Sequence, residues 1–77
     1  MNDTKEIARF EALAEEAYGA MYDVRDTGVK DCYDDARYNF GRAIDIAQMR
    51  GLAIDVARLI ARRDHIEAVY NSQFRRR

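Results

Sequence analysis

The chain has no proline, no tryptophan, one cysteine and one histidine among its 77 residues. A single cysteine, Cys32, excludes an intrachain disulfide, and one Cys with one His cannot supply the four ligands of a structural zinc site. No apolar run approaches the length of a secretion signal or a membrane span. We therefore expect a small soluble protein of a reducing compartment, the cytoplasm.

An excess of charge of either sign is also lacking. Thirteen basic residues face 14 acidic ones, for a net charge of -1. This balance does not point to nucleic acid or to an anionic membrane as a partner. The basic residues are eleven Arg and two Lys, which we interpret as a compositional bias rather than as phosphate recognition.

Glycine is scarce, and two of the four glycines divide the chain. Gly28 and Gly51 fall where the apolar periodicity lapses. We expect one helical domain, residues 1–77, with helices at about 4–24, 30–50 and 53–74 and a tail at 75–77. Gly19 and Gly41 lie inside these helices and are candidates for points of close helix approach.

Each predicted helix carries an apolar stripe in steps of three and four residues, which places the side chains on one helix face. The first stripe comprises Ile7, Phe10, Leu13, Ala14, Ala17, Tyr18, Met21 and Val24. The second comprises Tyr33, Ala36, Phe40, Ala43, Ile44 and Ala47. The third comprises Leu52, Val56, Leu59, Ile60, Ile66, Tyr70 and Phe74.

These stripes predict an all-α protein, a small antiparallel three-helix bundle. Because half of the second stripe is alanine, neighbouring helices can approach closely there, and Phe40 is expected to fill the centre of the core. The alternative is that the second and third helices continue through Gly51. The chain would then be a long helical hairpin that must dimerise into a four-helix bundle.

Arg63 is the one polar residue within the third stripe, so we single it out as a buried polar candidate. An interior arginine is costly unless it is paired and hydrogen-bonded. Asp31, Asp34 and Asp35 are candidate partners, since the third helix runs back toward the start of the second. The alternatives are a stem that carries the guanidinium to solvent, or a pair across an interface between two chains.

No set of residues predicts a catalytic, cofactor or metal site. Asp31, Asp34 and Asp35 lack the spacing of a calcium loop, and acids near a helix start are favoured without any metal. His65 has no second histidine to complete a carboxylate-bridged site. Acidic neighbours of Cys32 disfavour a reactive thiolate. We therefore expect no enzymatic activity and no cofactor.

Two kinds of binding surface remain. Apolar residues away from the stripe centres are candidates for binding a protein partner, which includes a second copy of the chain: Tyr22, Tyr38, Ile46 and Met49. The alternative is a nucleic-acid-associated regulator that uses arginines of the third helix and tail. Those candidates are Arg58, Arg62, Arg75, Arg76 and Arg77.

Ala36-x-x-x-Phe40-x-x-Ala43 resembles the second-helix pattern of a tetratricopeptide repeat, and Tyr18-Gly19-x-x-Tyr22 resembles part of its first helix. Repeats of that family form peptide-binding solenoids. Here the two parts lie several residues too far apart, the closing proline is absent, and there is one unit where at least three are usual. Our hypothesis is a helical protein–protein interaction module, with self-association left open.

Overall fold

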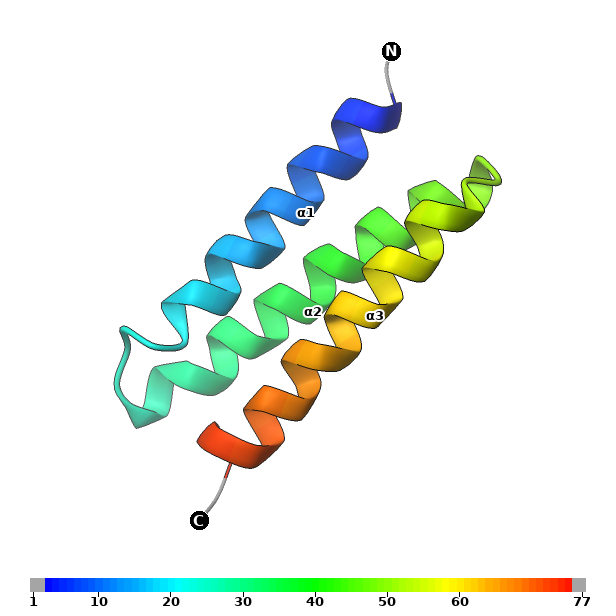
Figure 1. Ribbon diagram of the computed structural model, residues 1–77. Coiled ribbons are helices and arrows are strands. Elements are labelled where there is room, and N and C mark those ends of the chain that lie inside the picture. The colour runs from blue at the N-terminus through cyan, green and yellow to red at the C-terminus, as the bar shows by residue number, and fades with distance from the viewer. Residues whose placement is uncertain (1–2, 76–77) are drawn as a thin grey trace.

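A computed structural model describes residues 3–75, apart from the side chain of Asp26. It contains three α-helices, α1 (Asp3–Ala20), α2 (Asp26–Met49) and α3 (Ala53–Val69), followed by a π-helical turn, η1 (Tyr70–Phe74). Neighbouring helices run antiparallel, and the two ends of the chain lie at opposite ends of the bundle (Figure 1). The predicted three-helix bundle is thus confirmed. α1 and α3 approach each other less closely than either approaches α2.

Gly51 breaks the chain between α2 and α3, as the sequence predicts. Its φ of 69° lies in the left-handed region, which glycine adopts without steric penalty. The Gly51 N–H donates to the carbonyl of Gln48, and the Leu52 N–H donates to that of Ala47 at 2.9 Å. This pair of bonds is a Schellman motif, which satisfies the last carbonyls of α2. The continuous helix of the hairpin alternative is not formed.

The first turn differs from the prediction. α1 ends at Ala20 instead of residue 24, and α2 begins at Asp26 instead of residue 30. Gly28 therefore lies in the first turn of α2 and does not break the chain. A Cβ atom at Gly28 would lie 3.3 Å from the Cβ of Val24, so the missing side chain lets the connection pack against α2. The third predicted helix, 53–74, is observed, but its last five residues are π-helical.

The core is centred on α2. Phe40 is fully buried, and it is flanked on its own helix by three alanines that are also fully buried. α1 and α3 cover this face with larger side chains, among them Ile7, Met21, Leu59 and Ile66. Leu13 and Val24, which the first stripe includes, are 41% and 39% exposed and lie at its edge and in the turn.

Substituting glycines should separate backbone conformation from packing. Gly51→Ala forces a side chain into a left-handed conformation and should cost about 1–2 kcal/mol of unfolding free energy. Gly41→Ala should instead stabilise by about 0.5–1 kcal/mol, because alanine favours a helix interior. No neighbouring atom lies within 4 Å of a Cβ at Gly41 or Gly19, so neither marks a close approach. Urea denaturation measures both changes in unfolding free energy. Changes of the same sign in the two variants would contradict the left-handed conformation assigned to Gly51.

Phe40→Ala should lower the unfolding free energy by about 3–5 kcal/mol, because it opens a cavity beneath both neighbouring helices. Tyr38→Ala is the matched control. Tyr38 is 61% exposed on the same helix, and its truncation should change stability by no more than about 0.5 kcal/mol. Thermal unfolding followed by circular dichroism compares the two, and similar melting temperatures would refute the central role of Phe40.

Candidate functional site

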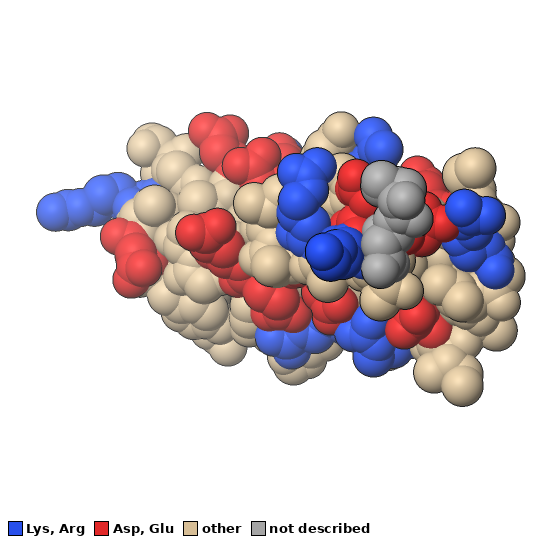
Figure 2. Space-filling view, turned by 90° about the horizontal axis from the view of Figure 1, so that it is seen from above, with Lys and Arg blue, Asp and Glu red and all other residues tan. Residues whose placement is uncertain are grey.

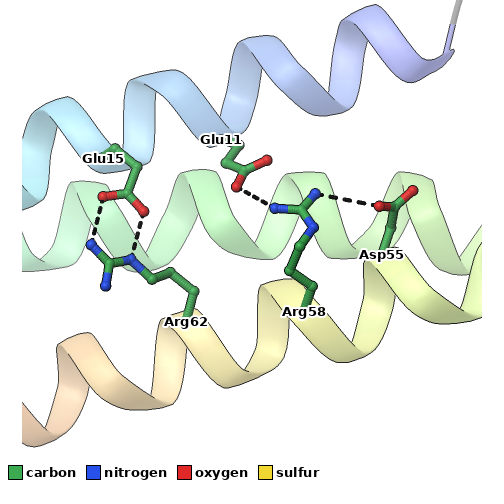
Figure 3. Close-up of polar contacts among 5 residues, drawn as sticks. All are labelled: Glu11, Glu15, Asp55, Arg58 and Arg62. Atoms are coloured by element: carbon green, nitrogen blue, oxygen red, sulfur yellow. Dashed lines mark hydrogen bonds and ion pairs between the residues drawn. The ribbon is translucent and has the colours of Figure 1, made fainter.

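Two arginines of α3 are bound by glutamates of α1. Arg62 makes two parallel hydrogen bonds to Glu15, from Nε to Oε2 at 2.7 Å and from Nη2 to Oε1 at 3.0 Å. Arg58 Nη1 donates to Glu11 Oε2 at 2.5 Å, and its Nη2 donates to Asp55 at 3.3 Å. Figure 3 shows both guanidinium groups extending from α3 across to α1. Charged side chains therefore bridge the two helices that approach each other least closely.

The two pairs share one register, because their partners are 47 residues apart. The same separation joins Asp3 of α1 to Arg50, which caps α2 just before α3 begins. A constant separation is expected because α1 and α3 run parallel. The hydrogen bonds that Arg62 donates to Glu15 raise the pKa of Arg62, although burial opposes this shift. Arg62 therefore stays charged at all physiological pH values.

Arg63, the buried polar candidate, is half-buried, with 32% of its side chain exposed. Its only carboxylate contact among the described residues is a loose one of 3.9 Å to the adjacent Asp64. The expected ion pair with Asp31, Asp34 or Asp35 is not formed, and Asp34 instead binds Lys30 at 3.0 Å. The long stem of Arg63 covers apolar surface while the guanidinium reaches solvent. Arg62, one position earlier, makes the contact between helices.

Aromatic side chains gather where α1 ends, α2 begins and η1 lies. Tyr33 and Tyr70 stack with ring centroids 3.9 Å apart, and Tyr22 meets Phe74 edge to face at 5.1 Å. Tyr18 contacts Tyr22 both through its ring and through a hydroxyl pair at 3.2 Å. This hydrogen bond, followed by desolvation, raises the pKa of Tyr18. The π turn widens the end of the helix and accompanies this cluster, which the sequence analysis did not anticipate.

The four candidates for partner binding do not form one patch. Tyr22 is 53% exposed but belongs to the aromatic cluster, and Ile46 packs partly buried against the core. Tyr38 and Met49 are 61% and 85% exposed on the outer face of α2. They lie about 16 Å apart along the helix axis, since they are eleven residues apart. Met49 lines a hollow together with Asp3, Ile46 and Arg50.

An apolar groove lies where α2 ends and α3 begins. It has a volume of about 490 Å³ and an open mouth, and we call it the α2–α3 groove. Ile54, which the sequence analysis did not single out, stands beside it and is 85% exposed. The sequence held a signal for Ile54, because it is a large apolar residue at a position of α3 that faces away from the core. The groove is lined by Gln48, Leu52, Ala53, Val56, Ala57 and Ile60.

The outward side of α3 is unusually apolar for a surface helix. Among its eight exposed residues only Arg58 and Asp64 carry a formal charge, and His65 is the one other polar residue. The remaining five are Ala53, Ile54, Ala57, Ala61 and Ala68. A helix with apolar residues on both its inner and outer sides is typical of one that is covered on both. α3 thus presents a smooth face that continues from the groove.

The residues of the nucleic-acid alternative are mostly engaged elsewhere. Arg58 and Arg62 bind carboxylates of α1, and Arg75 Nη1 donates to the Asn71 side chain at 3.3 Å. Arg76 and Arg77 lie outside the described residues. Figure 2 shows acidic and basic side chains interleaved over one face of the bundle, without a continuous basic area. A phosphate backbone would have to compete with the internal ion pairs.

Comparison of the chain with protein-family models, curated proteins and solved structures finds no match. Within residues 3–75, no three His, Cys, Asp or Glu side chains are grouped so that they could hold a metal ion. Over the same range, none of the helices has the length and apolar character needed to cross a membrane. The surfaces described above are therefore the basis for a functional proposal.

The pair of Arg62 and Glu15 should contribute only modestly to stability. Both side chains are more than a third exposed, so solvent screens the interaction. We expect a coupling of about 0.5–1 kcal/mol from a double-mutant cycle of Arg62→Ala and Glu15→Ala in urea denaturation. The coupling should decrease at high salt. A value near zero at low salt would mean that the contact does not hold α3 to α1.

Arg63→Leu is the comparison for this cycle. Because its only ion pair is long and exposed, replacing it with an apolar residue should leave stability unchanged or raise it slightly. A loss as large as that caused by Arg62→Ala would show that Arg63 has a structural partner outside the contacts described here.

Proposed function

We propose that the protein is a small interaction module that binds another protein through helix docking on the α2–α3 groove and has no catalytic activity of its own. The observation that carries the proposal is an apolar groove beside which the large apolar side chain of Ile54 is 85% exposed. Burying Ile54 on a partner would contribute about 1.5–3 kcal/mol. We place the module in the cytoplasm, which its single free cysteine favours.

The size and lining of the groove favour a helix as the occupant. The groove is open, and its α3 side consists of small and branched apolar residues along two turns. An amphipathic helix presents side chains at steps of three and four residues, which can enter such a groove in succession. The alanines on the outward side of α3 would let the backbone of that helix approach closely. A second copy of the chain is one possible source of it.

The proposal predicts that an amphipathic peptide of about 18 residues, with a Leu/Ala face and no net charge, binds the protein. Ala57→Gln should weaken this binding about tenfold, because the added side chain fills the groove. Ala57 is exposed and glutamine is a good helix former, so the fold should be kept. Fluorescence anisotropy of the labelled peptide measures the affinity.

Ala68→Gln is the matched control, since Ala68 is also exposed on α3 but does not line the groove. It should leave the affinity unchanged. Equal affinity for both variants, or no binding to the unmodified protein, would refute docking at this groove. Light scattering on a sizing column over a range of protein concentrations determines whether the chain also binds itself.

A further inference from the structure

We infer that the outward face of α3 binds the same face of a second copy of the chain, with the two α3 helices antiparallel around a two-fold axis at Ala61. This interface goes beyond the proposed function, because its centre lies outside the α2–α3 groove. The outward face consists of the exposed residues Ile54, Ala57, Arg58, Ala61, Asp64, His65 and Ala68. Of these, only Ala57 also lines the groove.

The apolar residues of this face match one another in size when two copies are paired end to end. Ile54 lies seven residues before Ala61, and Ala68 lies seven residues after it, so the three share one side of the helix. A two-fold axis at Ala61 therefore places the large Ile54 of each copy against the small Ala68 of the other. Ile54, which is 85% exposed in the single chain, becomes covered, and Ala61 lets the two helices approach closely.

The two formal charges of the face are complementary in the same arrangement. Arg58 lies three residues before Ala61 and Asp64 three residues after it, about 4.5 Å along the helix axis in opposite directions. The two-fold axis brings Arg58 of each copy to the height of Asp64 on the facing helix. The interface thus gains two pairs of opposite charge at its centre.

Both charged groups have room for this pair. Asp64 is 62% exposed, and its only ion pair among the described residues is the one of 3.9 Å to Arg63. Arg58 is 48% exposed, and its bonds to Glu11 and Asp55 use two of the five N–H donors of the guanidinium. The bond to Asp55 is 3.3 Å long and solvent-exposed, so exchanging it for a carboxylate of the second copy costs little.

The antiparallel orientation follows from the same residues. In a parallel pair each side chain would meet its own kind, so Arg58 would face Arg58 and Asp64 would face Asp64, which disfavours association. Two Ile54 side chains would also meet at one end and two Ala68 side chains at the other. Both the charges and the sizes therefore match in the antiparallel orientation.

The first test concerns the two-fold axis. Sedimentation of the full chain at about 0.05 M salt measures the dissociation constant of the dimer. Ala61→Gln adds two larger side chains at the axis and should weaken the dimer at least tenfold. Ala8→Gln is the matched control, since Ala8 is exposed on α1, and it should leave the dimer unchanged. Glutamine is a good helix former, so both variants should keep the fold, which circular dichroism checks.

The second test concerns the charges. Asp64→Lys turns both pairs with Arg58 into pairs of like charge, and it should weaken the dimer about tenfold at about 0.05 M salt and less at about 0.5 M. Glu16→Lys changes the net charge equally on the exposed surface of α1 and should have little effect.

The outcomes separate this interface from the groove. A chain that stays monomeric up to about 1 mM would overturn the inference, as would a dimer that Ala61→Gln and Ala8→Gln weaken equally. Equal effects of Asp64→Lys and Glu16→Lys would also overturn it. A dimer that Ala57→Gln dissociates and Ala61→Gln does not would place the second copy in the groove instead. Peptide binding at the groove should persist in Ala61→Gln, so the proposed function stands or falls separately.

Discussion

Phe40 can be fully buried because the residues around it on α2 are alanines. Because Ala36, Ala43 and Ala47 have small side chains, α1 and α3 can both pack close to the inner face of α2. The ring of Phe40 fills the space between the three helices. A helix with larger side chains at these positions would hold its neighbours farther away. As a consequence the core is narrow and centred on α2, and α1 and α3 have few contacts with each other.

The arginine–glutamate pairs on the seam between α1 and α3 follow from that geometry. Long side chains can close a gap that short apolar ones cannot, and they remain hydrated while they do so. They also favour one of the two hands that three antiparallel helices can adopt. In the other hand, α1 would face the flank of α3 that carries Val56 and Ile60, and Glu11 and Glu15 would lose their partners. Individually weak pairs thus select between two arrangements with the same apolar stripes.

Helix periodicity was enough to predict the three helices, the buried Phe40 and the break at Gly51. It was not enough for the first turn, because Gly28 serves the packing of Val24 instead of ending a helix. Arg62 and Arg63 show a second limit. They differ by about 100° around α3, and which of them reaches a carboxylate depends on the side from which α1 packs. The stripes are the same for both hands, so the sequence pattern does not contain that information.

Commitment of the arginines also determines what the opposite side of α3 can do. The guanidinium groups that close the α1 seam are paired with carboxylates of α1, whereas Arg63 lies one turn after Ile60, on the flank of α3 that borders the α2–α3 groove. The end of the bundle near Gly51 is left with exposed Met49 and Ile54 and with a face of alanines. The proposed function would thus place stability and recognition on opposite flanks of one helix.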